Sequence, residues 1–498
     1  MLKRGSGILL HIVSLPSPFG IGDLGEQACK FADFLASAHQ SYWQVLPLNP
    51  SDSQRDFSPY SSNSSFALNP LFIDPLFLVK RGLIPQSMVQ PLSDCNPECV
   101  AYEKVVPFKM ELLQQAFSQA QSQGLGSDFF LFCEKNASWL DSHALFITLS
   151  NNFNNQPWNK WPAPLRDRDP QALKEFSNQF HQQIQKEKFY QYLIMQQWQN
   201  LHQHCKEIGV QLIGDLPMFV SYDSVDVWAN REFFKLDQQL LPAFYAGAPP
   251  DRFNSQGQLW HNPVYNWEVL KKQEYSFWIE RFRRSFELFD ILRIDHFRGL
   301  IAYWETPANQ QNASGGTWQS VPVDDFFNTV FKHFFCFPVI AEDLGIITPD
   351  VREAMSRFKI PGTKVFLFSF ENLNPNHPYL PHNYEKNCMA CTGTHDTNTI
   401  KGWYQQDCTD QERQNLLHYL GMKAGSEIIN WKAIRLLMQS AADMVIFPLQ
   451  DILGYGSEAR MNTPGTRKNN WRWRYREGAI TTEIQNKLKE LTILFGRG

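Results

Sequence analysis

The sequence has no excess of either charge, since 46 Lys+Arg stand against 50 Asp+Glu in 498 residues, for a net charge of −4. A protein that binds nucleic acid through its phosphates needs a basic surface, so this balance argues against that class. The chain also lacks the run of about 18 consecutive apolar residues that a membrane-spanning helix needs. At 43% hydrophobic residues it is too apolar for a disordered chain. We therefore expect a folded protein that binds neither nucleic acid nor a membrane.

Cysteine is also sparse: there are nine, scattered along the chain, and an odd number cannot all be paired in disulfides. Free thiols are typical of a reducing compartment. The apolar run 8–13 is too short for the core of a signal peptide, and no small-residue cleavage site follows it. We expect a cytoplasmic protein. No His-x-x-x-His ligand spacing is present, and no metal site or cofactor is predicted.

Aromatic residues are abundant instead, at 14% with 39 Phe, 16 Tyr and 15 Trp. They can fill an apolar core, or they can offer flat faces for stacking on sugar rings. Composition alone allows both readings.

Eight short apolar runs have the character of buried parallel strands, and most follow a segment with helical periodicity. Strands that alternate with helices predict a parallel sheet, and eight of them predict an α/β fold of the (β/α)8 TIM-barrel type with no separate C-terminal β domain. The runs are Ile8–Val13, Tyr42–Leu48, Gln211–Leu216, Ile291–Phe297, Val339–Leu344, Lys364–Phe370, Met389–His395 and Met444–Gln450.

The uneven spacing of these runs predicts one catalytic domain over residues 1–498 with two large insertions. The first, at about 70–205, is Gln-rich and helical in pattern. The second, at about 218–290, is rich in Pro, Gly, Asn and Trp and contains Ala246–His261, which has the composition of a mobile lid loop. A further Gly/Asn-rich loop follows the eighth run, at 454–473.

Acidic residues end several of the runs. Arg293 and Asp295 alternate along the fourth run and point the same way, so the arginine charge favours an ionised carboxylate suited to a nucleophile. Glu342 emerges from an apolar run, which raises the pKa of a carboxyl and suits a general acid/base. Asp396 and Asp215 end two further runs.

Each of these acids alone is more simply the N-cap of a following helix. Four strand ends that converge on one barrel mouth favour a site, and paired carboxylates are the minimum for glycoside chemistry. A metal site is the competing chemical reading of several acids with a histidine.

The ordered motifs of the chain resemble those of glycoside hydrolase family 77, the 4-α-glucanotransferases or amylomaltases of the α-amylase clan. The resemblance runs nearly end to end. It includes Ser14–Gly25, Trp43–Leu48, Ser58–Ser62, Gly214–Pro217, Asp223–Trp228, Pro249–Asp251, Arg293–Gly299, Ala341–Gly345, Gly393–Asp396, Gly456–Gly465 and Trp471–Arg474.

The resemblance implies that Asp295 is the nucleophile, Glu342 the general acid/base and Asp396 the third carboxylate, which grips sugar hydroxyls. It implies transfer of α-1,4-glucan segments between glucans or maltooligosaccharides through a covalent glucosyl-enzyme, a mechanism that requires no cofactor. The sequence leaves the oligomeric state open, and a monomer or a homodimer is compatible with it. The implied substrate-binding residues are Tyr60, Asp215, Phe253, Gln258, Trp260, Arg293, His395, Asn462 and Pro464.

Two departures from the family pattern stand out. Thr397-Asn398-Thr399 follows the third carboxylate where Asn-Asp-Thr is usual, so that an amide replaces an acid. Lys468-Asn469 lies where a glycine is common.

Three rival functions remain open. An α-1,4-glucan hydrolase would use the same carboxylates, and a silent glucan-binding protein would need none of them. Gly20-Ile-Gly22-Asp-Leu-Gly25 fits the G-x-G-x-x-G fingerprint of a nicotinamide- or flavin-dependent oxidoreductase. However, six residues with two prolines separate these glycines from the preceding strand, and the next strand has no acid at its tip.

Overall fold

A parallel barrel forms the centre of the protein. The computed structural model describes residues 3–93, 95–250, 254–372, 374–422 and 428–498. Eight parallel strands are hydrogen-bonded in the order β10-β11-β12-β1-β2-β3-β6-β9. The Ala341 N–H donates to Pro361 O at 2.8 Å and Thr363 Oγ1 donates to Ala341 O at 2.9 Å, which brings β9 against β10 and closes the barrel. The predicted (β/α)8 barrel is confirmed. Its strands are β1 (Gly5–Leu9), β2 (Tyr42–Gln44), β3 (Gln211–Leu216), β6 (Ile291–Ile294), β9 (Val339–Ala341), β10 (Gly362–Val365), β11 (Cys388–Cys391) and β12 (Met444–Pro448).

Each predicted run overlaps one of these strands, but the first was placed too late in the chain. Strand β1 begins at Gly5, and Ile12–Ser14 form a 3-10 turn. The two glycines of β1 allow the chain to pack closely on β2, because a Cβ on Gly7 would lie 2.4 Å from Tyr42 O. Gly5 and Gly7 therefore belong to the barrel wall, although glycines this close to a chain end are more typical of a flexible segment.

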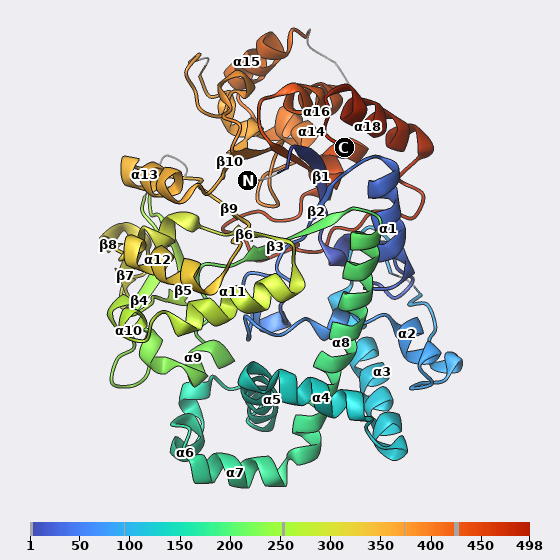
Figure 1. Ribbon diagram of the computed structural model, residues 1–498, viewed down its shortest axis with the longest axis vertical. Coiled ribbons are helices and arrows are strands. Elements are labelled where there is room, and N and C mark those ends of the chain that lie inside the picture. Colours follow the sequence, from blue (N-terminus) through green and yellow to red (C-terminus); the bar gives the residue numbers. More distant parts are fainter. Residues whose placement is uncertain (1–2, 94, 251–253, 373, 423–427) are drawn as a thin grey trace.

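Helices surround the barrel and fill the long connection between β2 and β3. In Figure 1, α4–α7 lie at the opposite end of the molecule from α15, α16 and α18, and α8 runs between that end and the barrel. The helices are α1 (Glu26–Ser37), α2 (Pro75–Lys80), α3 (Tyr102–Gln123), α4 (Ser127–Lys135), α5 (Ala137–Asn152), α6 (Ala163–Arg166), α7 (Pro170–Gln179), α8 (His181–Glu207), α9 (Val225–Ala229), α10 (Trp267–Lys272), α11 (Ser276–Leu288), α12 (Val323–His333), α13 (Pro349–Phe358), α14 (Ile400–Gly402), α15 (Asp410–Leu420), α16 (Ile429–Gln439), α17 (Leu449–Leu453) and α18 (Thr482–Leu494).

A second sheet, which the periodicity did not predict, lies beside the barrel. It is antiparallel with the order β5-β4-β7-β8, from β4 (Phe244–Ala248), β5 (Gln258–Pro263), β7 (Ala302–Pro307) and β8 (Thr317–Ser320). Both ends of the predicted lid loop Ala246–His261 thus belong to paired strands. The sheet also joins the insertion before β6 to the segment after it. The division into one domain with two insertions stays a prediction.

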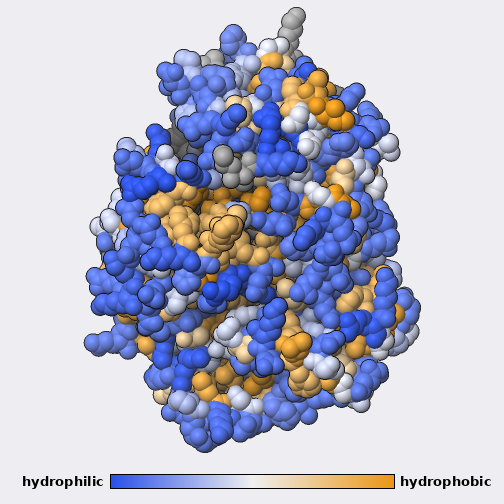
Figure 2. Space-filling model, viewed as in Figure 1, coloured by the Kyte–Doolittle hydropathy of each residue, from blue (hydrophilic) through white to orange (hydrophobic). Residues whose placement is uncertain are grey.

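Most phenylalanines pack in the core. Phe282 of α11 is buried, and the partly buried Phe286, Phe334 and Phe337 pack around it, with ring centroids 4.9–6.5 Å apart. Figure 2 shows a largely hydrophilic face with an apolar area near its middle, over the region where Figure 1 places α11 and α12. No helix among the described residues is long and apolar enough to cross a membrane.

The glycines of the G-x-G-x-x-G segment have a packing role. The Gly22 N–H donates to Val13 O at 3.0 Å, and a Cβ on Gly22 would lie 1.9 Å from Ile12 O. Gly25 directly precedes α1. Close backbone approach accounts for this motif without a nucleotide.

Candidate active site

Three carboxylates from three strand ends open into one cleft. Asp295 follows β6, Glu342 follows β9, and Asp396 lies five residues beyond β11. All three line a cleft of about 680 Å³. The carboxyl ends of barrel strands are where enzymes of this fold hold their reacting groups.

Arg293 links two of the acids on the floor of this cleft. Its Nη1 donates to both carboxylate oxygens of Asp215, at 2.6 and 2.7 Å, and to Asp295 Oδ1 at 3.0 Å. Burial alone lowers the pKa of Arg293, but the carboxylates of Asp215 and Asp295 raise it well above its usual value. Tyr60 Oη donates to Asp215 Oδ2 at 2.6 Å. A permanent positive charge and a tyrosine hydroxyl therefore fix Asp215, and the same charge holds the Asp295 carboxylate.

Glu342 lies in a drier environment than Asp295. Its side chain is almost fully buried, and burial raises the pKa of its carboxyl to about 7, with the Arg293 charge opposing this shift and the Asp295 charge adding to it. The His296 N–H donates to Oε2 at 2.7 Å and the Leu344 N–H to Oε1 at 2.9 Å. These donors fix the carboxyl beside Asp295, and its pKa lets it give and take a proton near neutral pH.

Asp396 is held by Asn462 and lies near His395. Asn462 Nδ2 donates to Asp396 Oδ1 at 2.6 Å, and His395 Nε2 lies 3.5 Å from Asp396 Oδ2. The Asn462 N–H also donates to His395 O at 3.1 Å. The loop after β12 is thereby joined to the loop after β11 at the third carboxylate.

Aromatic rings form part of the wall. The ring of Tyr60 stacks on His395 with centroids 4.9 Å apart. The ring of Trp471 packs at a tilt against both, with centroids 5.7 Å from Tyr60 and 5.8 Å from His395. Trp260 packs edge-on against His296 at 4.8 Å, and its indole N–H donates to Gln258 Oε1 at 3.1 Å.

The structure brings the predicted site residues together. The cleft is lined by Tyr60, Gln258, Trp260, Asp295, Glu342, His395, Asp396, Asn462 and Pro464. Asp215 and Arg293 lie buried behind its floor. Phe253 lies outside the described residues. Of the two tryptophans in the motif Trp471–Arg474, Trp471 lines the cleft and Trp473 lines a separate pocket.

Comparisons with known proteins give the family of the chain. A family model described as 4-alpha-glucanotransferase matches residues 10–481. A 4-alpha-glucanotransferase of Aquifex aeolicus (strain VF5) is 42% identical over 496 residues, which cover 99% of each chain. The chain belongs to the 4-alpha-glucanotransferase family. A 4-alpha-glucanotransferase of Synechocystis sp. is 41% identical over 501 residues, 99% of this chain and 98% of the relative.

Solved structures of this family share the fold. The amylomaltase from Streptococcus agalactiae in complex with acarbose superposes with a TM-score of 0.95, at 34% identity and with 100% of both chains covered. Membership of the 4-alpha-glucanotransferase family makes the protein a glucan-transferring enzyme, and the hydrolase and oxidoreductase alternatives are not favoured.

One departure from the 4-alpha-glucanotransferase pattern has a simple structural reason. Asn469, where glycine is common, has a φ of 65°. Asparagine tolerates this left-handed conformation better than most residues, so the turn of the loop is kept.

Sequence reasoning missed His296. It has a φ of 45°, which is unusual for a residue other than glycine, and its N–H reaches Glu342 in that conformation. Burial lowers the pKa of its imidazole to about 4, so the ring is neutral at physiological pH. Its place directly after Asp295 was the available signal. Arg55 and Asp223 form an ion pair at 3.6 Å on the cleft wall; Asp223 begins one of the motifs that resemble the family, whereas Arg55 had no signal in the sequence.

Proposed function

We propose that this enzyme transfers α-1,4-glucan segments by a retaining double displacement at Asp295 and Glu342. The observation that carries the proposal is the contrast between the two acids. Asp295 Oδ1 accepts a hydrogen bond from Nη1 of the positively charged Arg293, whereas burial raises the pKa of Glu342 to about 7. Two carboxyl groups in different environments can act as nucleophile and proton donor.

In the first step Asp295 Oδ attacks the anomeric carbon, and the glycosidic C–O bond breaks as Glu342 gives its proton to the leaving oxygen. In the second step Glu342 takes the proton from the 4-hydroxyl of an acceptor glucan, whose oxygen attacks the same carbon and frees Asp295. Both steps invert the carbon, so the α configuration is retained, and this mechanism calls for the carboxyls to be about 5–5.5 Å apart. Asp396 and Asn462 bind sugar hydroxyls, and no cofactor takes part.

Incubation with maltotriose tests this function. We expect a ladder of longer maltooligosaccharides together with glucose, since each transferred segment extends an acceptor. Chromatography of the products over time separates the two outcomes. Glucose and maltose with no longer product would contradict transfer and indicate hydrolysis.

Trp260 favours transfer by keeping water from the glucosyl-enzyme. Its ring packs edge-on against His296, the residue after Asp295, and lines the cleft. A flat ring in this place can hold an acceptor sugar. In Trp260→Ala we expect the ratio of hydrolysis to transfer on maltotriose to rise about tenfold, because one stacking contact is worth ~1.4 kcal/mol. Trp304→Ala, in β7 and outside the cleft lining, is the control and should keep the wild-type ratio. An unchanged ratio in Trp260→Ala would exclude the role of this ring.

We further propose a cytoplasmic monomer or homodimer that acts on maltooligosaccharides and longer α-1,4-glucans. All nine cysteines lie in the described part of the chain and all are free thiols, which supports a reducing compartment. The near-neutral charge suits an uncharged substrate that needs no electrostatic steering.

A further inference from the structure

A polar network lies behind Asp396 and joins the two loops that hold it. We call Asn398, Asp407, Ser457 and Arg460 the Arg460 network. Asn398 follows the third carboxylate, Asp407 ends the π-helical turn Trp403–Asp407, and the other two residues precede Asn462. Asn398 and Arg460 also line a buried pocket that adjoins the cleft, since His395 lines both.

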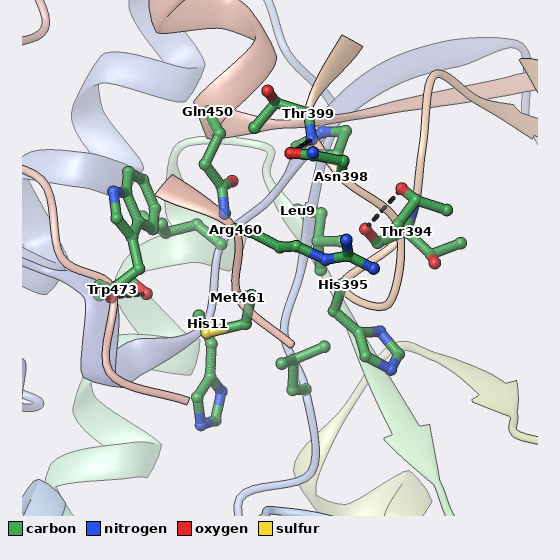
Figure 3. A pocket seen from close by; sticks show the side chains of 15 residues that line it. Leu9, His11, Thr394, His395, Asn398, Thr399, Gln450, Arg460, Met461 and Trp473 are labelled. Carbon is green, nitrogen blue, oxygen red and sulfur yellow. Dashed lines mark hydrogen bonds between the residues drawn. The ribbon is translucent and has the colours of Figure 1, made fainter. Parts of the chain in front are cut away.

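Arg460 clamps the backbone on both sides of the Asp396–Asn462 contact. Its Nη2 donates to Asp396 O at 2.9 Å and its Nε donates to Asn462 O at 2.8 Å. Figure 3 shows the side chain extending across the pocket toward Thr394 and His395. The rigid guanidinium of Arg460 thus fixes the distance between the loop of Asp396 and the loop of Asn462. The side chains of these two residues are 2.6 Å apart in the cleft.

Asp407 and Asn398 hold Arg460 in place. Arg460 Nη1 lies 3.6 Å from Asp407 Oδ2, and Asn398 Nδ2 donates to the same oxygen at 3.0 Å. Asn398 Nδ2 also donates to Ser457 Oγ at 2.8 Å, and its Oδ1 accepts from the Thr399 N–H at 2.9 Å. The amide therefore serves as a donor toward a carboxylate.

This arrangement gives a physical reason for the amide at position 398. Asn398 is buried, and the lack of a side chain at Gly402 leaves space for it, because a Cβ there would lie 2.3 Å from Asn398 Oδ1. An aspartate there would place two carboxylates about 3 Å apart, and like charges so close disfavour each other.

We propose that Arg460, held by Asp407 and Asn398, is a positioning residue that fixes the Asp396–Asn462 pair for substrate binding. The inference rests on the substrate-binding role proposed above for that pair. A purely structural arginine would affect how much protein folds, whereas a positioning residue affects how well each folded molecule binds sugar.

Titration calorimetry with acarbose separates these two roles. In Arg460→Gln we expect the dissociation constant to rise about tenfold with unchanged stoichiometry, because the lost hydrogen bonds involve a charged group. Arg460→Lys should recover part of the affinity, since its single ammonium can reach one carbonyl. With maltotriose, kcat should fall and KM should rise. Arg357→Gln removes an exposed arginine paired with Asp324 and should match the wild type.

Two outcomes would overturn the proposal: a dissociation constant within twofold of wild type in Arg460→Gln, or a fall in stoichiometry alone. The maltotriose ladder of the wild-type enzyme is measured separately, and its absence would contradict the proposed function instead.

A charge exchange tests the network itself. Asp407→Asn should raise the acarbose dissociation constant about threefold, as expected for a partly exposed ion pair. Asn398→Asp should raise it about fivefold through the carboxylate contact, and the double variant Asn398→Asp/Asp407→Asn should return to within about threefold of wild type. If the dissociation constant of the double variant instead rises by the product of the two single increases, Asn398 and Asp407 do not act together.

Discussion

Asp295→Asn should abolish glucan transfer and leave acarbose binding nearly intact. We expect the rate on maltotriose to fall by at least about 10⁴-fold, since a neutral amide oxygen is a far weaker nucleophile than the carboxylate that the covalent step needs. The asparagine has the same shape, and its amide oxygen can still accept from Arg293, which keeps its contacts to Asp215. The acarbose dissociation constant should stay within about tenfold of wild type.

The control for this variant is Asp324→Asn, which removes one charge from an exposed ion pair with Arg357. Initial rates on maltotriose and calorimetry with acarbose measure the two effects. Transfer within a factor of ten of wild type in Asp295→Asn would remove this residue from the role of nucleophile. Loss of both binding and transfer would indicate a damaged cleft.

The barrel could be predicted because its strands are local patterns. A buried parallel strand is a short apolar run, and polar residues that end several runs meet at one edge of the sheet. Asp295, Glu342 and Asp396 could be predicted from this pattern alone. It placed β1 late, because the packing of Gly5 and Gly7 on Tyr42 is visible only once the two strands are side by side.

The second sheet could not be predicted because its pairing is not local. Strand β4 pairs with β7, although α11 and β6 lie between them in the sequence. The periodicity of hydrophobic residues does not indicate which distant segments pair. The same limit applies to Asn462 and Asp396, which lie 66 positions apart in the sequence and 2.6 Å apart in the cleft. Only the family resemblance could name Asn462 from the sequence.

The contrast between the environments of Asp295 and Glu342 could be seen only in the structure. The sequence indicated an apolar setting for Glu342, but the backbone donors that orient its carboxyl come from His296 and Leu344. His296 provides its donor from a left-handed conformation that nothing in the composition predicts. The orientation of the Glu342 carboxyl thus depends on backbone geometry that the sequence does not reveal.

Glu342→Gln should block attack on a substrate whose leaving oxygen must be protonated, and should spare attack on a substrate whose leaving group needs no proton. With maltotriose, whose leaving group is a sugar oxygen, we expect the rate to fall by about 10³-fold or more. With α-maltotriosyl fluoride the leaving group needs no proton, so Asp295 should still be glycosylated. The glucosyl-enzyme should then accumulate and be detectable by mass spectrometry, because no base activates the acceptor. Added azide, which carries no proton to remove, should release it as the α-azide.

The pH dependence gives the matching test in the wild-type enzyme. The pKa of Glu342 is raised from 4.5 to about 7, so the proton that the first step needs is present below pH 7 and is lost as the pH rises through it. We expect kcat/KM on maltotriose to fall about tenfold for each pH unit above that point. Glycosylation of Glu342→Gln by the fluoride should lack this fall, since glutamine does not titrate. A fall of the same size in the variant would assign the alkaline limb to another group and leave Glu342 without its role as the acid.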